Sequence, residues 1–270
     1  GGFTVASYPA YGFAEGTVLD GVVPNTVLQE ESVVGDCRIL RRVNAFCDPP
    51  CGAGQTCDHD GSCIGYPLAQ DVGVVTVEGL AAAAVMSPLS PGATYFLGTL
   101  PNPPWVAGET VRLMTTADGA LGALTLWGVG PQPVAFPEPD TTWTLAQDGD
   151  LSIAWSAPTG PVRTEVHVSL TIDQHGTSPL SLECVFADTG SGTVPASVIT
   201  TLVQDGVSGF PNGRLQRRTM DRAEGAWGCV DFAVTQPLEP DVRVAGHTPC
   251  TKTSDCPSNQ TCNVTLETCE

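Results

Sequence analysis

The sequence predicts an all-β protein: two β-sandwich domains of immunoglobulin-like (Ig-like) type, with two small, disulfide-stapled, cysteine-rich modules. Three observations predict this class. Short stretches of alternating apolar and polar residues recur along the chain, 30 glycines and 23 prolines separate them, and nine of the eleven cysteines gather toward the two ends. Regular short strands with glycine- and proline-rich turns are typical of sandwiches and barrels.

Composition shifts divide the chain into segments. A boundary is expected at residues 131–140, where four prolines interrupt a strand-rich stretch. Trp155 precedes both Cys184 and Cys229, so the second domain is not of the antibody type. The predicted segments are an extended arm (1–35), a first β domain (36–46 and 67–138), a cysteine-rich module inserted in it (47–66), an Ig-like β-sandwich (139–248) and a C-terminal cysteine-rich module (249–270).

The N-terminal arm has strand-length apolar patches but is too short to form a core alone. We expect it to be extended and to bury side chains against a β-sheet. That sheet belongs either to another copy of the chain or to the arm's own domain. The apolar side chains concerned are Phe3, Val5, Val18, Leu19 and Val27.

The body of the chain contains a series of predicted strands. Residues 164–172 show the pattern most clearly, because Val166, Val168 and Leu170 alternate with polar residues, as in a half-buried strand. One short helix is expected over 195–203, beginning at a proline. The predicted strands are residues 72–77, 94–97, 110–115, 123–127, 142–145, 151–155, 164–172, 180–186, 215–220 and 229–234.

One cysteine pattern occurs twice. A Gln-Thr-Cys triplet stands at the same place in both copies, with one further cysteine downstream and two upstream. Two copies of one module should share one connectivity, although four cysteines allow three pairings. We expect first-to-third and second-to-fourth bridges, which are Cys47–Cys57 with Cys51–Cys63, and Cys250–Cys262 with Cys256–Cys269.

Three cysteines lie outside this repeat. Cys184 and Cys229 are expected on neighbouring strands and bridged to each other. Cys37 is then left over, either as a buried thiol or as the site of an intermolecular bond.

No metal or cofactor site is expected. Neither cysteine module has the Cys-x2-Cys spacing of a zinc site. Residues 58–61 (Asp-His-Asp-Gly) match part of a calcium loop, but its remaining ligands are missing, so a plain turn is favoured.

The chain resembles secreted or lipid-anchored, cysteine-rich proteins of the myxobacterial type, a family without a known activity. The resemblance implies no functional residue. It rests on Cys47-Asp-Pro-Pro-Cys51 with Cys57 and Cys63-Ile-Gly-Tyr-Pro, on residues 73–79 (Gly-Val-Val-Thr-Val-Glu-Gly), on Leu182-Glu-Cys184-Val-Phe-Ala-Asp-Thr-Gly190 with Val194-Pro-Ala, and on Asp255-Cys-Pro with Cys262 and Cys269.

Charge and hydropathy exclude a nucleic-acid partner and a membrane-spanning helix, respectively. Eleven basic and 29 acidic residues give a net charge of −18, which would repel a nucleic acid. The longest apolar run, residues 80–86, is far shorter than the roughly 20 residues of a membrane-spanning helix. Seven arginines fall in two groups, which either pair with nearby acids, meet an acidic surface of a neighbouring copy, or bind an acidic extracellular polysaccharide. They are Arg38, Arg41, Arg42, Arg214, Arg217, Arg218 and Arg222.

No enzymatic activity is expected. The chain has no Gly-x-Ser-x-Gly, His-Glu-x-x-His, Walker or Gly-x-Gly-x-x-Gly motif. A catalytic triad is spatial, so the four histidines, His59, His167, His175 and His247, do not decide the question by themselves. His167 is expected on the outer face of a strand, as a surface residue, and no catalytic residue is assigned.

Dense cysteines indicate an oxidising compartment, so we expect an extracellular or cell-surface bacterial protein, mature after signal removal. Two functions are considered. The first is a structural subunit of a surface filament, layer or matrix, with copies of itself as partners. The alternative is a monomeric surface binding or adhesion module that recognises a glycan or another protein, with Trp105 and Trp127 as candidate contacts.

Overall fold

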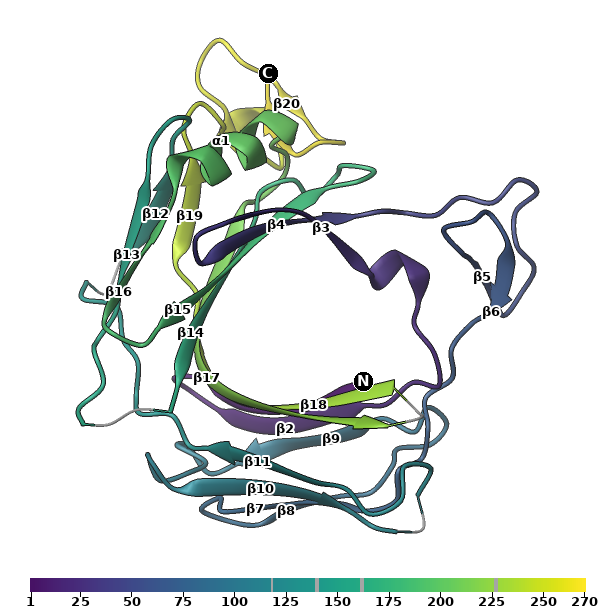
Figure 1. Cartoon of the computed structure of the whole chain (residues 1–270). Coiled ribbons are helices and arrows are strands. Elements are labelled where there is room, and N and C mark those ends of the chain that lie inside the picture. The colour runs from purple at the N-terminus through teal and green to yellow at the C-terminus, as the bar shows by residue number, and fades with distance from the viewer. Residues whose placement is uncertain (118, 139–140, 161–162, 226–227) are drawn as a thin grey trace.

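The computed structural model describes residues 1–117, 119–138, 141–160, 163–225 and 228–270. Its main feature is a nine-stranded sheet that curves around an open centre (Figure 1). All neighbouring strands are antiparallel except β1 and β18, which run parallel. Across the sheet the order is β3 (Leu28–Val34), β4 (Cys37–Arg42), β15 (Leu180–Ala187), β14 (Glu165–Thr171), β17 (Asn212–Gly225), β18 (Gly228–Leu238), β1 (Gly2–Ser7), β2 (Gly12–Thr17) and β9 (Tyr95–Leu100).

Smaller elements cover the outside of this sheet (Figure 1). A four-stranded sheet lies below it, in the order β11 (Thr125–Val129), β10 (Thr110–Thr115), β7 (Val75–Glu78) and β8 (Ala84–Met86). Beside it lie two ribbons and a helix, which are β12 (Thr142–Leu145) with β19 (Asp241–Val244), β13 (Leu151–Ala154) with β16 (Ser191–Val194), and α1 (Ala196–Asp205). There are also two short 3-10 helices. The first, η1 (Pro24–Thr26), precedes β3, and the second, η2 (Thr253–Asp255), lies in the C-terminal module.

Two apolar cores lie between the large sheet and its covers. Core A lies under β4, β15, β14 and the start of β17, and contains Trp143, Trp155 and Phe186. Core B lies between β18, β1, β2, β9 and the four-stranded sheet, and contains Phe3 and Phe232. Helix α1 begins after Pro195 and buries Val198, Ile199 and Leu202 in core A.

The all-β class is correct, and every predicted strand overlaps an observed one. The Ig-like form is not confirmed, because one continuous sheet serves both cores. Strand β17 places Leu215 in core A and Ala223 against core B. The predicted boundaries also differ from the cores, since β4 (predicted with the first domain) adds to core A and β18 (predicted with the second) adds to core B.

The N-terminal segment is extended and pairs within its own chain, which is the second of the two alternatives that the sequence left open. Strand β1 lies inside the sheet between β18 and β2. Phe3, Val5 and Val18 are buried in core B, whereas Leu19 is half-buried and Val27 is 37% exposed. Gly16 lies opposite Phe3 and makes room for its ring, because a Cβ there would lie 2.0 Å from the ring.

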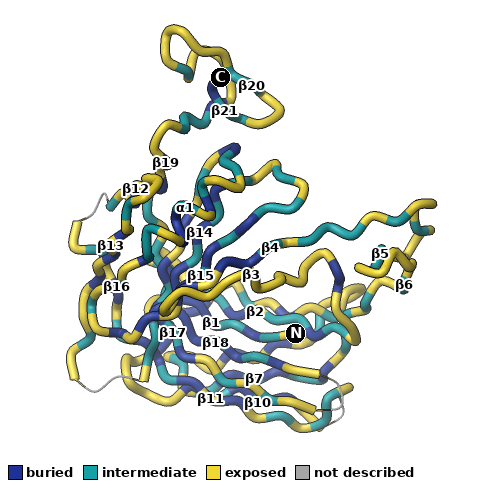
Figure 2. The backbone as a smooth tube through the Cα atoms, turned by 45° about the horizontal axis from the view of Figure 1, so that its top comes forward, coloured by how far each residue is buried: buried dark blue, intermediate teal, exposed yellow. Residues whose placement is uncertain are grey.

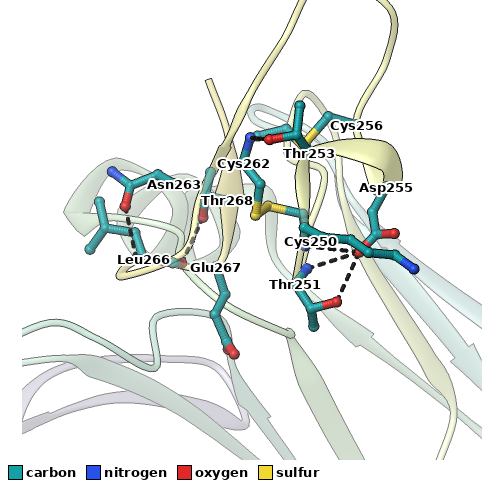
Figure 3. Close-up of a disulfide and its surroundings, with 12 residues drawn as sticks. Cys250, Thr251, Thr253, Asp255, Cys256, Cys262, Asn263, Leu266, Glu267 and Thr268 are labelled. Carbon is teal, nitrogen blue, oxygen red and sulfur yellow. Dashed lines mark hydrogen bonds between the residues drawn. A yellow bond between two sulfur atoms is a disulfide. The ribbon is translucent and has the colours of Figure 1, made fainter.

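All eleven cysteines are described, and ten of them form five disulfides. Both modules have the predicted connectivity, with Cys47–Cys57 and Cys51–Cys63 in one and Cys250–Cys262 and Cys256–Cys269 in the other. Figure 3 shows the Cys250–Cys262 bridge and its surroundings. Their small hairpins are β5 (Gln55–Cys57) with β6 (Cys63–Gly65) and β20 (Cys262–Asn263) with β21 (Thr268–Cys269).

The expected Cys184–Cys229 bridge is wrong. Cys184 bonds to Cys37, which lies directly opposite it on the neighbouring strand β4. Cys229 is instead the free cysteine and is exposed. The alternation along β18 explains this, because Val230 points into core B and turns Cys229 away from it.

The modules are held by local hydrogen bonds. In the first, the carboxylates of Asp58 and Asp60 accept backbone N–H groups within the turn at residues 58–62, as a plain turn does. The second module docks on the body, where the Gly209 N–H donates to the Leu266 carbonyl at 2.8 Å and His175 Nε2 lies 3.3 Å from a Glu267 carboxylate oxygen. Within the described part of the chain, no helix has the length and apolar character needed to span a membrane.

Candidate binding face

The inner face of the curved sheet is covered by neither core, and we call it the concave face (Figure 1). Side chains alternate between the two faces of a strand, and directly paired residues share a face. Residues that alternate with core residues along a strand therefore line the concave face, and so do the residues paired with them on neighbouring strands. Figure 2 shows this alternation of burial along the central strands, and it shows β3 exposed along its whole length.

Four aromatic side chains form a row across one half of the concave face, which we call the aromatic row. They are Tyr8 and Tyr11 from the β1–β2 turn, Phe13 on β2 and Phe96 on β9. Ring centroids are 4.9 Å apart for Tyr8 and Tyr11, 6.1 Å for Tyr8 and Phe13, and 6.4 Å for Phe13 and Phe96. Tyr11 is 52% exposed and Phe96 54% exposed, so the row presents ring surface outward.

The turn that carries Tyr8 and Tyr11 is fixed by hydrogen bonds. The Tyr8 N–H donates to the Tyr11 carbonyl at 2.8 Å. The Asn102 amide donates to the Tyr8 and Pro9 carbonyls at 3.2 and 3.1 Å, and the Ser7 hydroxyl donates to Asn102 Oδ1 at 3.1 Å. The row is therefore held in place before any ligand arrives, which lowers the entropic cost of binding.

Three pockets lie along this face. One of about 490 Å³ lies beside the aromatic row and is lined by Thr4, Glu15, Thr17 and Phe96, among others. The other two share Ser169 and Asn212 as wall residues, and their volumes are about 540 and 410 Å³. Pockets of this size accommodate small ligands or single units of a larger one.

The arginines of the concave face are paired with acids of the same chain. The pairs are Arg38–Glu183 at 2.6 Å, Arg214–Glu239 at 3.0 Å, Arg218–Glu165 at 2.9 Å and Arg222–Asp231 at 2.6 Å. Away from this face, Arg41 pairs with Glu31 and with Asp205 at 2.9 Å, and Arg217 is buried against Asp188. The sequence-predicted interface of basic residues is thus neutralised, apart from Arg42, whose side chain has no such partner among the described residues.

The prediction of His167 as a surface residue is wrong: it lies on the concave side of β14, away from core A, but it is buried and only 8% exposed. Its Nε2 lies 3.6 Å from a Glu183 carboxylate oxygen, and its buried Nδ1 has no hydrogen-bond partner in the described part of the structure. Hydrogen bonding from His167, and then from Arg38, lowers the pKa of Glu183 to about 2. Glu183 is therefore a fixed negative charge on this face at neutral pH.

The aromatic row adjoins this charged region. Burial raises the pKa of Tyr8, and the charges of Arg214 and Glu239 act on it in opposite directions. Strands β1 and β18 run parallel with Ala6 opposite Thr235, so Tyr8 and Glu239 follow the adjoining ends of these two strands. Tyr8 is a neutral hydroxyl donor and acceptor at physiological pH.

The aromatic residues proposed from sequence are placed elsewhere. Trp105 is buried in core B, and its indole N–H donates to the Pro131 carbonyl at 3.0 Å. Trp127 is 50% exposed on β11, in the outer sheet, with the Arg112 guanidinium 5.4 Å from its ring centre. The sequence analysis missed the aromatic row, although three of its members lie within six residues of one another, at 8–13.

One cluster brings serine, histidine and aspartate together without forming a triad. The Ser208 hydroxyl donates to Asp173, and it accepts the main-chain N–H of His175 at 3.0 Å. The His175 ring points to Glu267 of the C-terminal module instead. In the part of the chain that the structure describes, no histidine ring contacts the Ser208 oxygen, so this cluster joins the loop to the C-terminal module and does not have the arrangement of a catalytic triad.

Comparison with known proteins adds no relative: no protein-family model matches the chain, and neither does any curated protein sequence.

Proposed function

We propose that this is a non-catalytic extracellular binding protein whose concave face binds a neutral saccharide chain. The observation that carries the proposal is the aromatic row, with Tyr11 and Phe96 more than half exposed on a preorganised surface. Sugar rings present patches of C–H groups that stack on aromatic faces, while their hydroxyls need hydrogen-bond partners. Exposed, rigid aromatic surface beside polar groups is typical of recognition sites.

Charge favours a neutral ligand over an acidic one. The chain carries a net charge of −18, and four arginines of the concave face are paired with acids, which leaves Arg42 as its one arginine without a carboxylate partner among the described residues. An acidic polysaccharide would be repelled at long range and would have to displace these partners. A neutral saccharide meets no such barrier.

The disulfides support an extracellular or cell-surface setting. Five bridges among eleven cysteines persist only where the surroundings are oxidising. A saccharide-binding face is useful in such a setting, where glycans of cell surfaces and matrices are abundant.

Substitution in the aromatic row tests this proposal. We expect Tyr11→Ala and Phe96→Ala each to weaken binding about tenfold, or roughly 1.4 kcal/mol, because each removes one stacking surface. The measurement is retention on immobilised amylose, xylan, mannan and galactan, followed by calorimetry with the polymer that binds best. Phe46→Ala is the matched control, because Phe46 is 80% exposed but lies outside the concave face. Absence of binding to all four polymers, or equal binding by all variants, would contradict the proposal.

A second candidate, a subunit of a self-assembling surface structure, is favoured by the edge strand β3. All seven of its residues are exposed, Val33 is 59% exposed, and the strand contains no proline. Such an edge offers free backbone groups to a strand of another chain. This candidate predicts native masses that are multiples of 28.0 kDa and that Val33→Lys converts to the monomer. A wild-type protein that is monomeric at high concentration would rule it out.

A further inference from the structure

We infer that the concave face holds a second, polar saccharide subsite on β14, β15 and β17, joined to the aromatic row in one track that binds an extended neutral oligosaccharide. This inference rests on the proposed function and names its ligand class more closely. The subsite is the 410 Å³ pocket, which we call the polar pocket; its walls include Arg42, Ser169, Thr171, Glu183 and Asn212.

Strand register brings these side chains to one face. Thr171 pairs with Ser181 on one side and with Asn212 on the other. Ser169 pairs with Glu183 in the same way. Because directly paired residues share a face, five polar residues from three strands line the same surface. Arg42 and Leu28, which pair with each other at the sheet edge, close its end.

Four polar side chains of this pocket are free to bind a ligand, whereas Glu183 is paired with Arg38. Among the described residues, the side chains of Arg42, Ser169, Thr171 and Asn212 make no hydrogen bond or ion pair with the protein. This contrasts with the neighbouring arginines, each of which is held by a carboxylate. Together these groups supply guanidinium and amide donors, an amide acceptor, and two hydroxyls that both donate and accept. Such a mixed set matches sugar hydroxyls, which also donate and accept.

The polar pocket and the aromatic row are connected. The polar pocket shares Ser169 and Asn212 with the 540 Å³ pocket, which is also lined by Arg214 and Glu239. Glu239 of that pair follows the end of β18, next to the end of β1, where Tyr8, the first member of the aromatic row, follows Ser7. From β14 to β2 there are four strand steps, or about 19 Å along the sheet. A ligand that occupies both ends must therefore be a chain of several sugar units.

The two subsites have different roles. The aromatic row provides stacking surface, which tolerates many sugars. The polar pocket provides directed hydrogen bonds, which distinguish the arrangement of hydroxyls. Loss of the polar pocket should then lower the affinity for long oligosaccharides and leave the affinity for short ones, which bind at the aromatic row, unchanged.

The test is affinity as a function of chain length. The probes are oligosaccharides of two to six units cut from the polymer, among amylose, xylan, mannan and galactan, that the wild type binds best. We expect wild-type affinity to rise at least tenfold between the dimer and the longest oligomer. Asn212→Ala with Thr171→Val should abolish that rise and leave the dimer's affinity unchanged. Asn259→Ala, at an exposed asparagine of the C-terminal module, is the matched control and should bind like the wild type.

The outcomes separate the two proposals. Binding that is sensitive to Tyr11→Ala but equal for the dimer and the hexamer overturns the polar subsite and leaves the aromatic site in place. A length-dependent rise that survives the double substitution also overturns it. Failure of the wild type to bind any of the four polymers removes the proposed function and the subsite together.

Discussion

Replacement of Arg217 by Met should lower the free energy of unfolding by about 3–5 kcal/mol, because it leaves a buried carboxylate without its counter-charge. Both Arg217 and Asp188 have fully buried side chains. Arg217 Nε and Nη2 donate to the two Asp188 oxygens at 2.7 and 2.9 Å. The remaining donors of the guanidinium serve the carbonyls of Gln132, Pro133 and Ser156.

Other donors to Asp188 do not replace this partner. The Trp155 indole N–H and the Thr164 hydroxyl also bind its carboxylate, at 2.9 and 2.6 Å, but neither is charged. Arg217 therefore ties β17 to the loops at 132–133 and 156, and to the end of β15. Replacement of Arg217 should therefore destabilise these segments, which lie at the edge of core A, together.

Urea unfolding followed by circular dichroism measures this effect. Arg214→Met is the control, because Arg214 and Glu239 are largely exposed and such pairs contribute about 0–1 kcal/mol. Arg217→Met combined with Asp188→Leu should recover part of the lost stability, since neither side chain is then charged. A loss below about 1 kcal/mol for Arg217→Met would contradict this role.

Removal of the Cys37–Cys184 bridge should lower the free energy of unfolding by a similar amount. The bridge joins residues 147 positions apart. In the chain-entropy model a loop of this length contributes about 4–5 kcal/mol by restricting the unfolded chain. The double substitution Cys37→Ala and Cys184→Ala should therefore lower the urea midpoint of the whole β body.

The module bridges provide the matched comparison. Cys51–Cys63 spans 12 positions within an exposed module, so its loss should unfold that module and leave the body unchanged. Proteolysis followed by mass spectrometry distinguishes the two variants, because cleavage should be confined to residues 47–66 when the Cys51–Cys63 bridge is removed. An unchanged midpoint for the Cys37 and Cys184 variant would show that strand pairing alone holds β4 on β15.

Local sequence pattern predicted ten of the strands, the helix and the four module bridges, because each depends on residues near one another in the chain. It missed the short strands β8, β16 and β19. It did not predict the Cys37–Cys184 bridge or the parallel pairing of β1 with β18, since both join residues more than 140 positions apart. No local signal marks which of several strands will be neighbours.

Alternation carried information about Arg217 that the sequence analysis did not use. Leu215, Arg217 and Thr219 lie on one face of β17, so an arginine on the face of a buried leucine requires a buried partner. The aromatic row was visible only in part. Tyr8, Tyr11 and Phe13 are close in sequence, but Phe96 joins them through the pairing of β2 with β9, which pattern does not reveal.

The central claim is that the concave face binds a saccharide through its aromatic row. Hydroxyl-radical footprinting with mass spectrometry tests it most directly, because the exposed rings are oxidised by the reagent. With the best-bound polymer present, oxidation of Tyr11 and Phe96 should fall several-fold, while Trp127 and Phe46, exposed outside the concave face, should be oxidised as before. Protection of Trp127 with no change at Tyr11 and Phe96 would place the ligand on the outer sheet and contradict the account.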